Sequence, residues 1–166
     1  MQSISFENGD EMPMIGLGTW KSPPGEVYEA VTTALEAGYR HVDCAPIYKN
    51  ETEVGAALSD SFDAGGIRRD DVWVTSKLWN NAHHPDDVRP ALEQTLSDLR
   101  LDALDLYLIH WPVALQPEVD FPESPDDFVS PEAVPLTETW AAMEALKKDG
   151  LVRHIGVSNF SVPNLQ

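Results

Sequence analysis

The sequence predicts an α/β fold in which short strands and longer helices alternate along one domain. Two observations lead to this prediction. In several segments apolar residues recur every three or four positions, the period of an amphipathic helix, and short apolar runs lie between these segments. One such run, residues 104–110, is almost continuously apolar, as in strands that are covered on both faces of a parallel sheet.

The first predicted elements are a hairpin, a strand and a helix. Residues 3–15 alternate in polarity around Asn8-Gly9, which is a strong turn signal, and they predict a short hairpin. Residues 15–20 predict a first strand. Residues 26–37 predict a helix, because their apolar side chains share one face and Gly38 supplies a C-cap.

The same alternation continues through the middle of the chain. Residues 39–43 and 72–78 predict the second and third strands, with a short helix at 51–58 between them. A helix is predicted over 85–99, and the fourth strand over 104–110.

A segment rich in proline and acidic residues, 112–135, then interrupts the rhythm. We predict a loop there without secondary structure; loops of this length in a compact domain are usually binding or lid elements, or disordered inserts. A helix over 137–149 and a fifth strand over 154–160 complete the pattern.

Repeated strand–helix units form either an open, doubly wound sheet or a closed barrel. GLGTW, residues 16–20, lacks the third glycine of the dinucleotide-binding GxGxxG motif and does not open a helix, which disfavours a Rossmann domain. We therefore predict a (β/α)8 TIM-barrel fold, truncated to about five βα units because a whole barrel takes roughly 250 residues. Residues 1–166 are expected to form one partial barrel domain with two exposed strand edges.

The charge balance is strongly acidic. The chain has 28 acidic and 11 basic residues, a net charge of -17, and the acidic residues are spread over the whole length. This charge argues against nucleic acid and anionic membrane surfaces as partners. A dispersed acidic coat is typical of proteins from salt-loving organisms, so we expect a halophilic protein; an ordinary acidic cytosolic protein is the alternative.

Other bulk features indicate a cytoplasmic location. Cys44 is the only cysteine, so no internal disulfide can form. The N-terminal residues lack the basic start and apolar core of a signal peptide, and no apolar run is long enough to span a membrane.

Four residues with useful chemistry lie where strand patterns end: Asp43, Tyr48, Lys77 and His110. Because the carboxyl ends of parallel strands meet at one end of a barrel, we expect these side chains to gather there. Singly, each has an ordinary structural explanation, as a helix cap, a packing group or a surface charge. At four equivalent places they indicate a proton-delivery apparatus for carbonyl reduction: a lysine ammonium that makes a tyrosine a stronger acid, an aspartate that holds the lysine, and a histidine that orients the carbonyl.

The chain closely resembles the aldo-keto reductase family. The resemblance is carried, in order, by GLGTW (16–20), GYRHVDCAPIYKNETEVGAAL (38–58), VTSKLWN (74–80), DLYLIHWP (105–112) and VRHIGVSNF (152–160). It implies a (β/α)8 barrel that reduces a small-molecule aldehyde or ketone with a nicotinamide cofactor, usually NADPH, with NADH not excluded. It also implies that Asp43, Tyr48, Lys77 and His110 are the catalytic residues, with Tyr48 as proton donor.

The resemblance extends to cofactor and substrate residues. Ser158 and Asn159 resemble the pair that holds the nicotinamide carboxamide, and the cofactor is expected to border Gly18, Thr19, Trp20 and Asp43. Trp20, Trp79, His110 and Trp111 are expected to line an apolar substrate pocket, although core packing explains Trp79 equally well. No metal site is predicted: His83 and His84 are assigned to the loop that starts a helix, because no further ligands have suitable spacing. His41 and Cys44 are expected to be packing residues.

The last three units of a family barrel have no counterpart in this chain. The chain is therefore either a catalytically incomplete fragment, a barrel completed by self-association or by a complementing C-terminal chain, or a degenerate relative. A nucleotide-sensing or structural module on the same scaffold is the alternative from another class, and another barrel enzyme such as an isomerase is more remote.

Overall fold

A computed structural model describes residues 2–165. Its centre is a five-stranded parallel sheet, in the order β3 (Leu17–Gly18), β4 (His41–Asp43), β5 (Trp73–Leu78), β6 (Leu104–Ile109) and β9 (Val152–Val157). The strands are joined by the helices α1 (Val27–Glu36), α2 (Glu51–Asp63), α3 (Pro85–Leu99) and α4 (Leu136–Lys148). The chain thus forms four strand–helix units and a fifth strand of a (β/α) barrel, as the sequence predicts.

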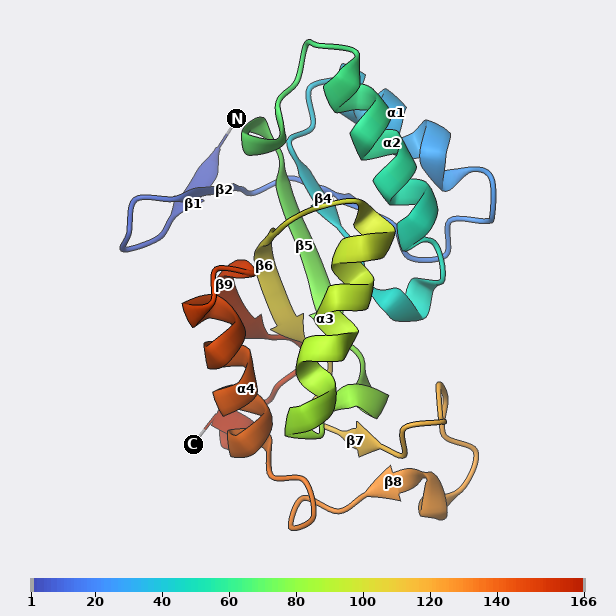
Figure 1. Cartoon of the computed structure of the whole chain (residues 1–166), viewed down its shortest axis with the longest axis vertical. Coiled ribbons are helices and arrows are strands. Elements are labelled where there is room, and N and C mark those ends of the chain that lie inside the picture. The colour runs from blue at the N-terminus through green and yellow to red at the C-terminus, as the bar shows by residue number, and fades with distance from the viewer. Residues whose placement is uncertain (1, 166) are drawn as a thin grey trace.

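The helices cover the outer face of the sheet, and neighbouring helices pack side by side in chain order (Figure 1). The main apolar core lies between these helices and the sheet, where Val74, Leu78, Leu92, Tyr107 and Ile109 are almost fully buried. Gly55 of α2 permits close packing against the end of α3, because a Cβ atom there would lie 2.2 Å from the carbonyl oxygen of Asp98.

A hairpin of β1 (Ser3–Ser5) and β2 (Glu11–Pro13) lies at the amino-terminal ends of the central strands (Figure 1). Gly9 occupies its turn with φ +88°, a conformation that favours glycine. Phe6 stacks on Trp73 with ring centroids 5.5 Å apart, and Asp10 bonds to His154 at 2.8 Å. The hairpin therefore covers the end of the sheet opposite to the ends on which the predicted catalytic residues lie.

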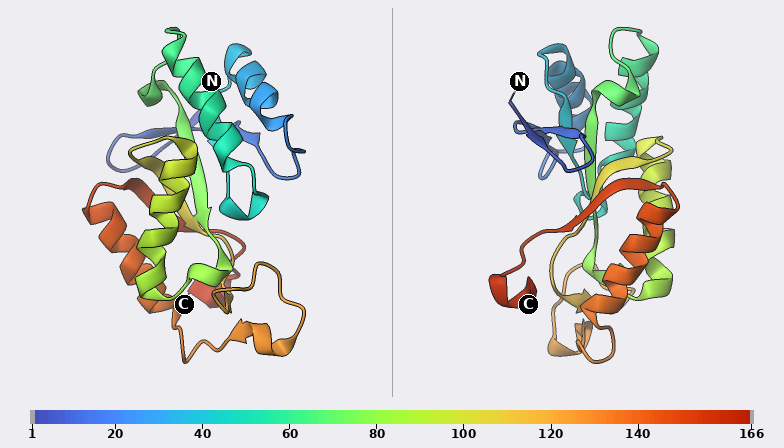
Figure 2. Two further views of the ribbon diagram at one scale, coloured as in Figure 1. Left: turned by 45° about the vertical axis from the view of Figure 1, so that its right-hand side comes forward. Right: turned by 90° about the vertical axis from the view of Figure 1, so that its left-hand side faces the viewer.

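Several predicted boundaries were wrong. Residues 112–135 are not structureless: β7 (Ala114–Leu115) pairs antiparallel with β8 (Phe128–Val129), at the carboxyl ends of the central strands (Figures 1 and 2). The fifth strand lies at 152–157, where it pairs with β6, and not at 154–160. The first strand has only two residues, and α2 runs five residues further than predicted, because Phe62 still packs against the core.

The sheet has two edges, β3 and β9, among the described residues. On β6 the side chains alternate: Asp105, Tyr107 and Ile109 are buried, whereas Leu106 and Leu108 on the inner face are only half-buried. In the right-hand view of Figure 2, α2, α3 and α4 lie on one side of the strands. No helix among residues 2–165 is both long and apolar enough to cross a membrane.

Candidate active site

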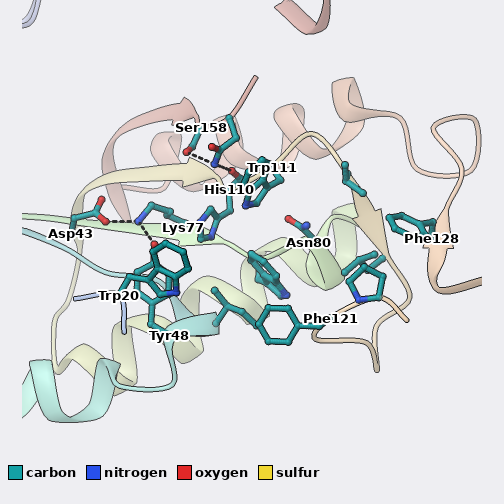
Figure 3. A pocket seen from close by; sticks show the side chains of 16 residues that line it. Trp20, Asp43, Tyr48, Lys77, Asn80, His110, Trp111, Phe121, Phe128 and Ser158 are labelled. Atoms are coloured by element: carbon teal, nitrogen blue, oxygen red, sulfur yellow. Dashed lines mark hydrogen bonds and ion pairs between the residues drawn. The ribbon is translucent and has the colours of Figure 1, made fainter. Parts of the chain in front are cut away.

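The four predicted catalytic residues lie together at the carboxyl end of the sheet. Asp43 is the last residue of β4, Lys77 is the penultimate residue of β5, and His110 directly follows β6. Tyr48 ends a 3-10 turn, Pro46–Tyr48, that carries the chain from β4 towards α2. All four line one pocket (Figure 3).

Lys77 is held by three acceptors. Its Nζ atom donates to Asp43 Oδ1 at 2.6 Å, to the carbonyl oxygen of Cys44 at 2.8 Å and to the hydroxyl oxygen of Tyr48 at 3.2 Å. An ammonium group has three protons, so these bonds use all of them and fix the group in space. The side chain of Lys77 is 6% exposed, which strengthens the interaction of its charge with Asp43.

The hydroxyl of Tyr48 is oriented by this bond. Because its oxygen accepts from Lys77, its own proton remains available for another acceptor. Tyr48 lies in the pocket wall beside His110, whose ring is 5.9 Å away in an edge-on arrangement. A carbonyl oxygen placed between the two rings would therefore meet a proton donor on each side.

His110 is an uncharged group at neutral pH. Burial, and secondarily the positive charge of Lys77, lower the pKa of His110 to about 4. Its Nδ1 atom is buried and has no hydrogen-bond partner among residues 2–165, whereas Nε2 is not among the buried unpaired atoms. The tautomer with its proton on Nε2 would donate a hydrogen bond into the pocket.

The pocket has a volume of about 580 Å³ and is mostly apolar. Trp20 and Trp111 line the pocket and are 67% and 43% exposed to solvent, so their rings are accessible to a ligand. Trp79 is also a pocket wall and not a core residue: its ring packs edge-on against His110 at 5.0 Å, and its Nε1 atom donates to the carbonyl oxygen of Asp120 at 2.9 Å.

The predicted cofactor residues divide into two groups. Ser158 and Asn159 line the pocket beside His110, where Asn159 Nδ2 donates to the carbonyl oxygen of His110 at 2.9 Å. Asn159 has φ +61°, so the backbone turns sharply there. Thr19, by contrast, is buried outside the pocket and bonds through Oγ1 to the carbonyl oxygen of Asp43 at 3.0 Å. It supports Asp43 from behind, and Gly18 likewise does not line the pocket.

Sequence reasoning missed part of the pocket wall. The residues that it did not single out are Ile47, Asn80, Val113, Leu115, Phe121, Pro122 and Phe128. Most of them belong to the segment around β7 and β8, which Lys49 anchors through an ion pair with Asp120. Phe121 and Phe128 are the only aromatic residues in this segment rich in proline and acidic residues, and that contrast was the available signal.

Among the described residues, no group of three or more His, Cys, Asp or Glu side chains is arranged to hold a metal ion. His84 is the N-cap of α3, where its Nδ1 atom accepts from the backbone N–H of Asp86 at 3.4 Å. His83 is buried. Cys44 is fully buried, and His41 bonds to Pro13 and Thr75.

A buried carboxyl group lies directly behind the site. Glu51, the first residue of α2, accepts hydrogen bonds from Ser76 at 2.6 Å and from Thr95 at 3.2 Å. Ser76 precedes Lys77 on β5, so Glu51 ties α2 and α3 to the strand that carries the ammonium group. Burial raises the pKa of Glu51 to about 7, against the hydrogen bonds that lower it.

We expect the Glu51→Gln variant to lose part of the pH dependence of stability. A raised carboxyl pKa makes the folded state hold the proton more tightly, so Glu51 lowers the free energy of unfolding as pH rises from about 4.5 to 7. Between pH 5 and 8 the variant should gain about 2 to 3 kcal/mol relative to the parent. Urea unfolding of both proteins at several pH values measures this change. The lowered pKa values of His83 and His110 favour stability at higher pH, but they affect parent and variant alike, so they cancel when the two free energies of unfolding are subtracted. A constant difference would mean that Glu51 is ionised throughout.

The parallel β/α units define a partial (β/α) barrel, with the site at the carboxyl ends of its strands. Residues 14–166 match the Aldo/keto reductase family. The chain is 55% identical to the aldo/keto reductase slr0942 of Synechocystis over 166 residues, and 52% identical to aldo-keto reductase family 1 member A1 of rat over 161 residues. The matched residues make up 100% and 96% of this chain, but only 51% and 50% of the two relatives.

Two solved structures also superpose closely on this chain. The aldose reductase of Schistosoma japonicum superposes with a TM-score of 0.93 at 48% identity, over 100% of this chain and 56% of that one. The aldose reductase of Giardia lamblia superposes with a TM-score of 0.86 at 49% identity, over 90% of this chain and 50% of that one. The chain belongs to the aldo/keto reductase family, and it spans about half the length of these relatives.

Proposed function

We propose that this site reduces an aldehyde or ketone to an alcohol by hydride transfer from a nicotinamide cofactor. The observation that carries the proposal is the chain of contacts from Asp43 through Lys77 to Tyr48, which opens onto the same pocket as a neutral His110. Aldehyde reduction needs a proton for the carbonyl oxygen as well as a hydride for the carbonyl carbon. The arrangement can supply that proton.

In the proposed mechanism, the carbonyl oxygen accepts hydrogen bonds from Tyr48 and His110. These bonds draw electron density towards the oxygen and hold the carbon in place. A bound reduced nicotinamide would supply the hydride for that carbon. Tyr48 gives its hydroxyl proton to the oxygen, so that an alcohol forms, and the ammonium of Lys77 stabilises the tyrosinate that remains. Asp43 balances the charge of Lys77 throughout.

The residues beside the pocket fit the carboxamide of a nicotinamide, which needs a hydrogen-bond donor and an acceptor. The hydroxyl of Ser158 accepts from Asn159 at 3.0 Å and so keeps its own proton to donate, while Asn159 has an amide oxygen to accept. Gly18 borders open space, since an added Cβ would meet no atom within 4 Å. We propose NADPH ahead of NADH on the family resemblance.

The proposal includes a second part of the barrel. Relatives of about twice this length contain further chain, and the half-buried inner face of β6 and the edge of β9 would pack against it. We propose that a complementing C-terminal chain, or a second copy of this chain, completes the site. A cytoplasmic location is part of the same proposal, supported by the single buried thiol of Cys44.

A fusion tests the proposed function directly. Residues 1–166 are joined to the C-terminal half of the Synechocystis reductase, and NADPH oxidation is followed with aromatic and aliphatic aldehydes in molar potassium chloride. We expect turnover, because all four proposed catalytic residues come from this chain. A matched fusion with Lys77→Met should lose it, because no ammonium group would then stabilise the tyrosinate. A folded fusion without turnover would contradict the proposal. Turnover by the 166-residue chain alone would show that self-association completes the site.

A further inference from the structure

Glu51 is connected to two of the proposed catalytic residues through the chain segments that carry them. It lies three residues after Tyr48, at the start of α2, and it is buried. Its Oε1 atom accepts from Ser76 Oγ at 2.6 Å, and Ser76 directly precedes Lys77 on β5. Because β5 is the central strand of the sheet, these contacts lie away from the edges β3 and β9. The segment of Tyr48 and the strand of Lys77 are therefore joined through one carboxyl group.

The residue before Glu51 holds the same segment from another side. Asn50 is buried, and its Nδ2 atom donates to the carbonyl oxygen of Thr19 at 2.8 Å. The chain that follows Tyr48 is thus fixed at two successive residues, one bonded to the loop after β3 and the other to β5. These bonds maintain the position of the Tyr48 hydroxyl, whose oxygen lies 3.2 Å from Lys77 Nζ.

We infer that Glu51 is a positioning residue of the proposed reaction, and that its protonated, uncharged form favours proton transfer from Tyr48. The inference rests on the proposed function and concerns the regulation of that site by pH. Proton transfer leaves a tyrosinate beside Lys77. A carboxylate held behind β5 opposes this new negative charge, whereas a carboxylic acid does not. Glu51 transfers no proton itself, and Tyr48 remains the donor.

The titratable groups around Glu51 belong to α3, β5, β6 and the chain after β4. Burial raises the pKa of Glu51 to about 7 against its hydrogen bonds; Asp98 of α3 raises it further, and Lys77 of β5 lowers it. Burial, and secondly the charge of Glu51, raise the pKa values of Tyr107 on β6 and of Cys44, which follows β4. The carbonyl oxygen of Cys44 is one of the three acceptors that hold Lys77. Glu51 therefore changes its charge near neutral pH, next to groups that hold the ammonium in place.

An NMR titration tests the inference without turnover. The 166-residue chain is labelled with ¹³Cζ-tyrosine, and the Tyr48 signal, assigned by its loss in Tyr48→Phe, is followed through its alkaline transition in the parent and in Glu51→Gln. In this range only the parent carries the charge of Glu51, so the acid constant of the Tyr48 hydroxyl should be about 3- to 10-fold larger in the variant. Glu53→Gln is the matched control: it removes a charge from the same turn of α2, where Glu53 bonds to the backbone N–H of Gly25 at 2.8 Å, and it should change the constant by less than about 2-fold. Equal constants in the parent and in Glu51→Gln would overturn the inference.

A kinetic experiment on the active fusion tests the effect on the reaction. The rate of hydride transfer in a single turnover, followed by NADPH absorbance, should fall in the parent as Glu51 ionises. The ratio of the Glu51→Gln rate to the parent rate should therefore rise about 2- to 5-fold from pH 6 to pH 8.5. A ratio that does not change with pH would show that Glu51 only packs, and would overturn the inference.

A second variant shifts the transition and keeps the carboxyl group. Ser76→Ala removes a hydrogen bond that lowers the pKa of Glu51, so the fall of the single-turnover rate should move to higher pH. A fall that stays at the parent's pH would contradict the role of Glu51. If no fusion turns over, the proposed function fails, and the NMR titration still decides whether Glu51 acts on Tyr48.

Discussion

Replacing Tyr48 by phenylalanine should lower kcat for aldehyde reduction by about 100- to 10,000-fold in the active fusion. The variant keeps the ring, which packs at 6.3 Å from Trp20 and 5.9 Å from His110, and loses only the hydroxyl. Without that group the hydroxyl proton that Tyr48 is proposed to give to the carbonyl oxygen is absent. The measurement is NADPH oxidation at saturating aldehyde, together with NADPH binding by fluorescence.

Cofactor binding should be unchanged in this variant, because the proposed carboxamide contacts are Ser158 and Asn159. Tyr28→Phe is the matched control: it removes a tyrosine hydroxyl that donates to Asp60 at 2.7 Å on the outer helices, away from the pocket. It should retain the parent rate. Undiminished turnover by Tyr48→Phe would exclude Tyr48 as the proton donor, and His110 would become the next candidate.

The sequence was sufficient to predict the parallel β/α architecture and the grouping of Asp43, Tyr48, Lys77 and His110. Both follow from one regularity, since parallel strands place their carboxyl ends at one end of the sheet. Lys77 shows the limit of that reasoning. It lies within β5 and not beyond it, and the direction of its side chain depends on strand alternation that a short apolar run does not reveal.

Other features depend on contacts between distant residues. The two-residue strands β7 and β8 are too short to give a periodic pattern, and the segment that contains them is fixed from outside, by the bond from Trp79 to Asp120 and by that from Asn81 to Pro117 at 3.2 Å. The burial of Glu51 also depends on contacts with distant residues. As the first residue of a predicted helix it would ordinarily be a surface charge, but here it lies buried against Ser76 of β5 and Thr95 of α3.

Potassium chloride should stabilise this protein strongly. The 11 basic residues cannot pair with more than a fraction of the 28 acidic ones, so most carboxylates repel one another across the surface. Salt shortens the range of this repulsion from about 10 Å at 0.1 M to about 3 Å at 1 M. We expect the Tm to rise by about 10 °C between 0.05 and 2 M, which corresponds to several kcal/mol for a domain of this size.

The ends of two helices provide a matched control for the salt effect. Glu36 and Asp63 are exposed, and each is the last residue of its helix, where a negative charge opposes the helix dipole. The double variant Glu36→Gln with Asp63→Asn removes two repelling charges and should be more stable than the parent in 0.05 M salt but nearly equal to it in 2 M. Its Tm should therefore rise less with salt. If parent and variant gain equally, the salt acts on apolar surface and not on charge, and the interpretation of the acidic coat as a halophilic adaptation would be wrong.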